Sequence, residues 1–479
     1  MKKFNFLVLG LMFSVFSLQA ADSVPAFLKN FPTESFHKLV SGNQVIGKTL
    51  FHWKPENGYL FFKEDSEMQL TLFKKPQIIT TSIGVWTNDK MEIQKFNFTM
   101  KSLESTIEIS AERQGNILKM RVTQAGKVQT KDVAIQEPVL MSPTIRPFLL
   151  MRGLPAEKAK FEAYVLEPAA LTTVPLSLEL TKKSKDLWTL KVSYLQHDLI
   201  SEINSVGSLI KEKSDFAGLP VEAVAVSKSE MSSMKVVGTK ADLVELSKVS
   251  FPSLPKAREL KSFSVKISGV DLKNYELNRH RQKLDRDILT VQVENPAIES
   301  APAQSLVGKK EFEKYLEGDT SIPVYDPVIQ KKAREIIGNE SDLWKRAKLI
   351  YDFVFKTLEK TPFTAVPNAI EALTSKKGDC KEHAALYTAL ARAAGIPTRT
   401  VVGLVYSDHF YGEPGFYYHA WVEVYTGKNW VAIDPTWNQI PADSTHLAFV
   451  EGGLDQQVQV TALMGKVKLS PVDATRPKL

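Results

Sequence analysis

The sequence predicts an α+β fold in which a large β-rich region precedes a domain of helices packed on an antiparallel sheet. Between Ser35 and Met231, short runs of β-branched and apolar residues alternate with turn residues at hairpin spacing. From Asp326 onward, apolar residues recur at helical spacing, and further strand-like segments follow. Strands first, then helices mixed with strands, indicate an α+β chain of more than one domain.

A hairpin is the clearest signal in the β-rich region. Residues 49–53 and 59–63 flank Asn57-Gly58, a pair that adopts the positive φ angles of tight turns. The other predicted strands are 104–111, 117–122, 176–180, 187–194 and 221–227. We predict one large antiparallel sheet or half-barrel over residues 21–250, with 143–158 as an irregular crossing. Its histidines, His37, His52 and His197, are isolated, so no catalytic group is expected here.

A β-containing connector is predicted over residues 251–305. It opens with the Pro-rich stretch 251–255, which is typical of a domain boundary. Two strands are expected, at 262–269 and 288–294. The charged segment between them, 278–286, is predicted to be a solvated loop.

The second large domain is predicted over residues 306–460, with a tail at 461–479. Asp326-Pro327 starts a helix that Gly338 ends, and Ser341 is predicted to cap the next helix. Both helices carry apolar residues at helical spacing, so they should form the core of this lobe.

A third helix of the lobe carries the single cysteine of the chain. Asp379 and Glu382 form a capping-box pattern, and Gly395 and Pro397 end the helix. Cys380 therefore lies in the first turn, where unpaired backbone N–H groups and the helix dipole stabilise a thiolate. We expect a thiol pKa below the ordinary value of about 8.5 and a nucleophilic cysteine.

Three strands follow this helix. Residues 398–406, 416–425 and 430–433 alternate in the manner of antiparallel strands and are joined by turns. Adjacent strands would bring His419 and Asp434 together. A neutral imidazole can take a thiol proton, and a carboxylate on its other nitrogen orients the ring and stabilises the imidazolium.

Three motifs occur here in a fixed order, namely G-D-C-x-E-H-A, H-A-W-V-E-V and W-x-x-x-D-P-T. Thirty-nine residues separate Cys380 from His419, and 15 separate His419 from Asp434. These motifs and intervals resemble the transglutaminase-like superfamily of papain-like cysteine enzymes over roughly residues 315–453. The resemblance implies a papain-like domain in which Cys380 is the nucleophile, His419 the general base and acid, and Asp434 the orienting carboxylate, with no cofactor and no metal.

One departure concerns the neighbours of the cysteine. Animal cross-linking transglutaminases have Gln and Trp there, whereas this chain has Asp379 and Lys381. The bacterial branch of the superfamily is therefore the closer match. Together with the lack of an EF-hand-like loop for calcium, this favours hydrolysis of the thioester over transfer to an amine.

Two other interpretations of Cys380 are open. It could be a small buried hydrophobic residue without chemistry, or it could pair with His383 in a zinc site completed by His409 or His446. The ordered motifs argue against the first interpretation. The lack of a second cysteine argues against the second, so His383 is predicted to be a structural residue and His409 a solvated one.

The N-terminus predicts export. Met1-Lys2-Lys3 precedes an apolar run, residues 4–18, and small residues follow, so we predict a signal peptide at 1–20 cleaved after Ala20. The alternative is an uncleaved anchor. We expect a periplasmic or secreted protein with no membrane span after cleavage.

Composition narrows the partners. Loss of Lys2 and Lys3 lowers the formal charge from +7 to +5, a mild bias, and no basic-aromatic run predicts nucleic-acid binding. The expected substrate is a protein or peptide, and the β-rich region is free to bind envelope components. The predicted activity is a secreted cysteine protease or amidase; the alternatives are a transamidating cross-linker and a non-catalytic envelope scaffold.

Overall fold

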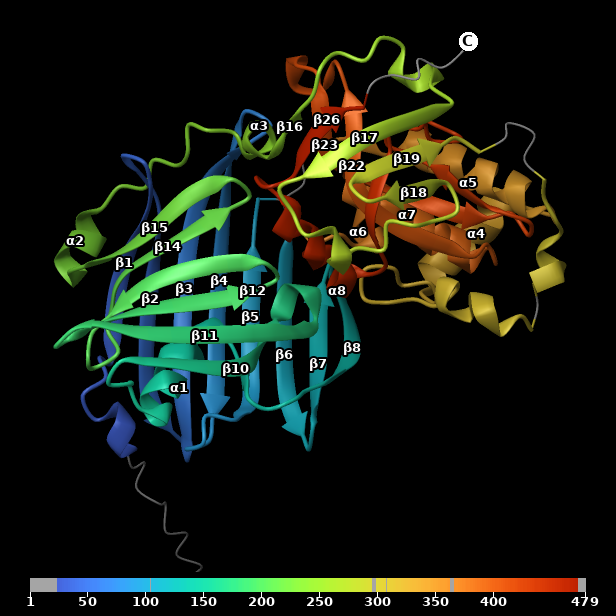
Figure 1. Ribbon diagram of the computed structural model, residues 1–479. Coiled ribbons are helices and arrows are strands. Elements are labelled where there is room, and N and C mark those ends of the chain that lie inside the picture. Colours follow the sequence, from blue (N-terminus) through green and yellow to red (C-terminus); the bar gives the residue numbers. More distant parts are fainter. Residues whose placement is uncertain (1–23, 104, 295–298, 307, 362–365, 473–479) are drawn as a thin grey trace, which may run out of the picture.

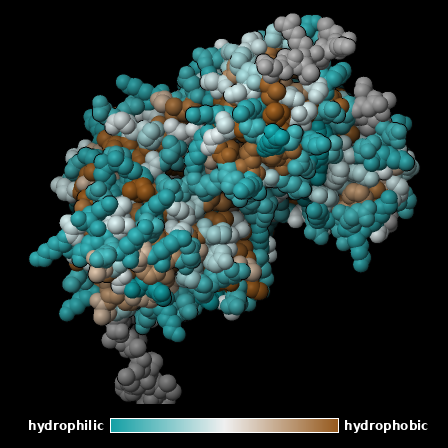
Figure 2. Space-filling model, in the orientation of Figure 1, coloured by the Kyte–Doolittle hydropathy of each residue, from teal (hydrophilic) through white to brown (hydrophobic). Residues whose placement is uncertain are grey.

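The computed structural model describes residues 24–103, 105–294, 299–306, 308–361 and 366–472 of the 479 (Figure 1). It contains a very large N-terminal sheet, blue to green in Figure 1, and a C-terminal lobe that is yellow to red. No helix in the described ranges is both long and apolar enough to cross a membrane. On the face in Figure 2, hydrophilic side chains predominate and hydrophobic residues form scattered patches.

The N-terminal part is one sheet of 15 strands in the order β8-β7-β6-β5-β4-β3-β2-β1-β15-β14-β13-β12-β11-β10-β9. Neighbouring strands are antiparallel, except that β9 pairs with β10 in parallel. The strands are β1 (Glu34–Ser41), β2 (Gln44–Glu56), β3 (Tyr59–Leu72), β4 (Lys75–Thr87), β5 (Ile93–Lys101), β6 (Thr106–Gln114), β7 (Ile117–Gln124), β8 (Lys127–Ala134), β9 (Val139–Leu140), β10 (Lys158–Glu167), β11 (Thr172–Ser184), β12 (Leu187–Tyr194), β13 (His197–Ile203), β14 (Leu209–Phe216) and β15 (Leu219–Val226).

The predicted large antiparallel sheet is confirmed. Asn57 and Gly58 join β2 to β3 with φ angles of 53° and 78°, as the turn pattern requires. The sheet curls, because Phe62 of β3 packs in one buried cluster with Leu178 of β11 and Leu190 of β12. Figure 1 shows the same curl, with β10 to β12 passing in front of β3 to β6.

The crossing predicted as irregular contains a helix, α1 (Ile145–Arg152). Phe148 and Leu149 are buried against the interior of the sheet. A helix of eight residues has little stability alone, so its packing, rather than its own propensity, determines that it forms.

After the sheet, the chain forms α2 (Lys228–Ser233), α3 (Leu243–Ser247) and β16 (Val249–Ser250), and then a four-stranded sheet of order β18-β19-β17-β26. Its strands are β17 (Ser262–Ser268), β18 (Gln282–Asp285), β19 (Ile288–Gln292) and β26 (Lys468–Pro471).

The prediction of a solvated loop at 278–286 is wrong. The side chains of Arg279 and Arg281 are only 5% and 4% exposed. Arg281 donates to two backbone carbonyls of the C-terminal lobe at 2.9 Å, and Arg279 pairs with Glu423 of that lobe. Carboxylates and carbonyls of the C-terminal lobe compensate the buried charges of these arginines. The local charge pattern does not reveal these partners, because they belong to another segment.

The C-terminal lobe packs helices on a sheet of order β16-β23-β22-β25, with β24 added to β23. Its elements are α4 (Pro327–Ile337), α5 (Leu343–Thr357), β20 (Glu359–Lys360), α6 (Ala369–Ser375), β21 (Lys377–Gly378), α7 (Cys380–Ala393), β22 (Thr398–Ser407), β23 (Gly415–Tyr425), β24 (Trp430–Ile433), β25 (Leu447–Glu451) and α8 (Leu454–Gln457).

The predicted helices of this lobe are confirmed, with one small correction. The residue that caps α5 is Asp342, not Ser341, because the Asp342 carboxylate accepts the N–H of Lys345 at 2.9 Å. Ile350 of α5, Leu386 of α7 and Val422 of β23 belong to one buried cluster. This core holds the start of α7 against β23.

Candidate active site

Cys380 is the first helical residue of α7, as predicted. The Asp379 carboxylate accepts the N–H of Lys381 at 2.9 Å, and Glu382 Oε2 accepts the N–H of Asp379 at 3.0 Å. This reciprocal capping box ends the preceding extended backbone at Asp379 and starts the helix at Cys380.

Gly378 is needed for this turn because the backbone approaches a side chain closely. A Cβ atom at Gly378 would lie 2.3 Å from the Cβ of the buried Glu382. Only a residue without a side chain leaves Glu382 in its capping position. The glycine of the Gly-Asp-Cys motif is therefore explained by packing, because it leaves room for the capping side chain of Glu382.

The expected lowering of the thiol pKa is wrong. Burial, and next to it the charge of Asp379, raise the pKa of Cys380 well above its ordinary value. A hydrogen bond with the backbone of Ala420 opposes this only in part. The helix dipole favours the thiolate, but desolvation of the thiol and the carboxylate that caps the same helix outweigh it. The resting thiol is therefore neutral and needs a base.

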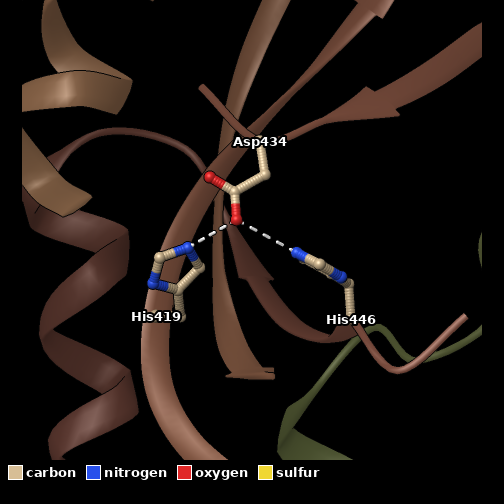
Figure 3. Close-up of side chains that lie close together, drawn as sticks. All are labelled: His419, Asp434 and His446. Atoms are coloured by element: carbon tan, nitrogen blue, oxygen red, sulfur yellow. Dashed lines mark hydrogen bonds and ion pairs between the residues drawn. The ribbon is translucent and has the colours of Figure 1, made fainter. Parts of the chain in front are cut away.

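His419 and Asp434 lie together, as the strand pattern predicted. β23 pairs with β24 in antiparallel register, which places Asp434, just after β24, beside His419. His419 Nε2 is 2.8 Å from Asp434 Oδ2, and both side chains are buried (Figure 3). The other Asp434 oxygen, Oδ1, accepts the backbone N–H groups of Thr436 at 2.8 Å and Trp437 at 3.0 Å.

The orientation of His419 determines what it can do. With Nε2 used by Asp434, the remaining nitrogen is Nδ1, which points away from the carboxylate in Figure 3. Cys380 hydrogen-bonds with the backbone of Ala420, the next residue along β23. The thiol and the imidazole thus lie at neighbouring positions where α7 meets β23.

A second histidine contacts Asp434, which the sequence reasoning missed. His446 Nε2 lies 3.2 Å from Asp434 Oδ2, and its Nδ1 lies 3.1 Å from Asp443 Oδ1 (Figure 3). Burial lowers the pKa of His446, but Asp443 and Asp434 outweigh it and raise the pKa to about 9. Burial raises the pKa of Asp434, yet His419 and His446 hold it well below its usual range. Asp434 is therefore ionised. Asp443-x-x-His446 was the only local signal for this pair.

Trp437 covers one side of His419. Their ring centroids are 4.7 Å apart, and Trp421 stacks at 6.4 Å. Exclusion of water by these indoles strengthens the ion pair that forms when His419 takes a proton.

The zinc interpretation of Cys380 finds no support in the described residues. The only group there whose His, Cys, Asp or Glu ligand atoms are close enough to hold a metal is His419, Asp434 and His446, within 4.8 Å of one another. Hydrogen bonds to one Asp434 oxygen already account for that spacing. His383 Nδ1 instead lies 2.7 Å from the Asp379 carbonyl, and His409 is exposed, as both predictions state.

A cysteine at the start of a helix, with a histidine on a strand packed against it and an aspartate just after the next strand, is the arrangement that the sequence motifs predicted. Residues 330–435 match the family model described as the transglutaminase-like superfamily. This part of the chain is a transglutaminase-like domain, as the motifs predicted.

The similar proteins share only part of the chain. An uncharacterised protein of Haemophilus influenzae is 26% identical over 140 residues, which cover 26% of this chain and 38% of that protein. A candidate cysteine protease from Cytophaga hutchinsonii is 16% identical, with a TM-score of 0.30, over 44% of this chain and 84% of that one. A candidate protease from Parabacteroides distasonis is 10% identical, with a TM-score of 0.21, over 74% of this chain and 67% of that one.

Proposed function

We propose that this protein is a cysteine-dependent acyl-transfer enzyme that cleaves amide bonds of proteins or peptides through Cys380, His419 and Asp434. The observation that carries the proposal is the 2.8 Å contact between His419 Nε2 and Asp434 Oδ2. That contact commits one imidazole nitrogen to the carboxylate and leaves the other for the thiol proton. The family match at 330–435 supports it.

The first step follows from the neutral resting thiol. As Cys380 Sγ attacks the amide carbonyl, His419 Nδ1 takes the thiol proton, and ionised Asp434 stabilises the imidazolium. His419 then gives this proton to the nitrogen of the scissile amide, and the C–N bond breaks. The amine departs, and an acyl thioester remains on Cys380.

The tetrahedral oxyanion would be held at the start of α7. The N–H of Lys381 is taken by the Asp379 side chain, and that of His383 by the Asp379 carbonyl. Within the described residues, no acceptor is paired with the Cys380 N–H. We assign this group as an oxyanion donor, because a fixed dipole at a dry helix start stabilises developing negative charge.

Hydrolysis is the proposed fate of the thioester. Water attacks the thioester carbonyl with His419 as base, and the acid product and free thiol are released. The departures at Asp379 and Lys381 from the cross-linking branch support this choice over transfer to a second amine. Incubation of the protein with casein and labelled cadaverine separates the two. New N-termini without label support hydrolysis, and dominant incorporation of cadaverine would replace it with transamidation.

The catalytic assignment is tested with casein, the wild type and two purified variants. Cys380→Ala should abolish release of new N-termini while unfolding at the same denaturant concentration as the wild type. Cys380→Ser, which has a similar volume but a weaker nucleophile, should retain at most a trace of this release. Full release by Cys380→Ala would overturn the assignment of this thiol as the nucleophile, and no release by the wild type would favour the non-catalytic envelope scaffold.

We also propose that the enzyme acts outside the cytoplasm, after cleavage of residues 1–20, on substrates of the cell envelope. The signal-like pattern at Met1 to Ala20 supports this proposal. Sequencing of the N-terminus of the exported protein should give Ala21 first. An intact Met1 on the exported chain would refute the cleavage.

A further inference from the structure

One end of the N-terminal sheet meets the catalytic lobe through its hairpin turns. Ser105 Oγ, beside the β5–β6 turn, donates to Glu371 at 3.1 Å. Gln124 Nε2, at the β7–β8 turn, donates to the Val366 carbonyl at 2.6 Å. Figure 1 shows the same ends of β5 to β8 approaching the lobe near α6 and α8. The sheet is therefore fastened to the lobe close to the active-site helix.

The β3–β4 turn reaches the other side of the site, the side of His419. Its Phe73 packs edge-on against Phe410 at 5.8 Å, and Phe410 lies 5.7 Å from Trp437. Trp437 in turn lies 4.7 Å from His419. We call Phe73, Phe410 and Trp437 the aromatic ledge. All three residues are only partly buried, so part of the ledge lies at the surface.

The buried carboxylate of Asp242 hydrogen-bonds to the neighbours of both Phe73 and Phe410. Asp242 Oδ2 accepts the backbone N–H of Lys74 at 2.5 Å and a short hydrogen bond from the hydroxyl of Tyr411. Its Oδ1 accepts the N–H of Val244 at the start of α3. Tyr411 holds a φ of 62°, which is unfavourable for a residue with a side chain and persists only where surrounding contacts impose it. The positions of Phe73 and Phe410 are thus set before any substrate arrives.

The side of the site on which the ledge lies follows from the chemistry of His419. In the proposed mechanism, His419 protonates the leaving amine, so the amine half of the substrate lies beside its ring. The ledge begins at that ring. An extended peptide advances about 3.3 Å per residue. The 4.7 and 5.7 Å steps from His419 to Phe410 therefore correspond to about the second to fourth residue after the cleaved bond.

We propose that Phe73 and Phe410 form a subsite for an aromatic side chain of the substrate, two to four residues on the amine side of the cleaved bond. This inference rests on the proposed function and deepens it. The N-terminal sheet then contributes to specificity, because Phe73 belongs to its β3–β4 turn. Partly exposed rings favour an aromatic partner because edge-to-face and offset stacking add to the burial of apolar surface.

The test uses chloroacetyl tetrapeptide amides, whose chains run from the reactive carbon in the direction of the amine half. Cys380 Sγ displaces chloride from the probe, and the mass of the intact protein reports each adduct on its single cysteine. One probe carries four alanines, and four others carry phenylalanine at one position each. The ratio of alkylation rates, Phe probe over Ala probe, measures the subsite without turnover.

We expect Phe at one of positions two to four to accelerate alkylation about five-fold in the wild type, and less than two-fold in Phe73→Ala. The matched control is Tyr59→Ala, an aromatic residue at the opposite end of β3, which should keep the wild-type ratio. Alkylation by iodoacetamide should be equal in all three proteins. Tyr411→Phe, which keeps the ring but loses the bond to Asp242, should lower the ratio part of the way.

An equal ratio in Phe73→Ala and wild type would overturn the inference, as would a wild type indifferent to phenylalanine at every position. These outcomes are distinct from failure of the proposed function. A protein that cleaves no casein but shows the Phe73-dependent ratio keeps the subsite and loses the hydrolase. If the wild type cleaves casein but Phe73→Ala has the wild-type ratio of alkylation rates, the hydrolase assignment stands and the subsite is refuted.

Discussion

Two buried histidines, one in each part of the molecule, have opposite electrostatic environments. His37 of the N-terminal sheet contacts the carbonyl of Leu209 and, among the described residues, pairs with no carboxylate; burial, and after it the charge of Arg146, lower its pKa to about 4. His446 of the catalytic lobe lies between Asp434 and Asp443, and its pKa rises to about 9. The sheet therefore buries a neutral ring, whereas the lobe buries a cation that holds a carboxylate ionised. The difference lies in the charged partners, because both rings are buried.

The largest expected contrast between the two parts is in turnover. His419→Ala should lower kcat for casein at least about a thousand-fold, because His419 is the proposed acceptor of the thiol proton. Asp434→Asn should lower it less, since the imidazole remains but is misoriented. His37→Gln, the matched control in the sheet, should stay within about two-fold of wild type. Comparable losses in His37→Gln and His419→Ala would erase the distinction between the regions.

The second contrast concerns stability against pH. His446 has a folded pKa near 9, above the unfolded value of about 6.5. Its contribution to the free energy of unfolding is therefore full below pH 6.5 and is lost as the pH rises through 9. His37 has a folded pKa near 4, so its contribution is full above pH 6.5 and is lost as the pH falls toward 4. Each amounts to about 3 kcal/mol at most.

Urea denaturation between pH 4 and 10 measures both effects. His446→Gln should flatten the alkaline limb of the stability curve, and His37→Gln the acid limb. If either variant flattened the limb assigned to the other, the assigned charge states would be wrong.

A smaller effect is expected at the cap of α7. Asp379→Asn keeps a side chain that caps helices well but removes the charge that helps to raise the pKa of Cys380. The pH midpoint of alkylation by iodoacetamide should therefore fall. Lys29→Gln, an exposed charge change at the start of the chain, should leave the midpoint in place. An unchanged or higher midpoint in Asp379→Asn would show that the charge of Asp379 does not raise the thiol pKa.

The two regions also differ in how far the sequence predicts them. Hairpin turns such as Asn57-Gly58 and the capping box at Asp379 are local, so they predict the sheet and the start of α7 correctly. The motifs around Cys380, His419 and Asp434, with their 39- and 15-residue intervals, are also visible in the sequence, so they predict the candidate site residues. The buried arginines at 279 and 281 and the contact of His446 with Asp434 depend on residues that only the fold brings together, and the local Asp443-x-x-His446 pattern indicates only the contact between those two residues.

The pKa of Cys380 also depends on packing that the sequence does not show. The helix dipole is a local property and predicts a lower pKa. Desolvation and the proximity of Asp379 are properties of packing, and they prevail. The helix start identifies Cys380 as a candidate nucleophile, but only the packing determines its resting protonation state.

The central claim is that Cys380 carries the acyl group during turnover, and an acid quench tests it most directly. Casein peptides are mixed with excess enzyme, the reaction is stopped in acid within seconds, and the proteolytic fragment that contains Cys380 is weighed. We predict a thioester adduct on Cys380 that hydroxylamine removes, and none in His419→Ala. Rapid release of new N-termini by the wild type with an unmodified Cys380 at every quench time would contradict the account.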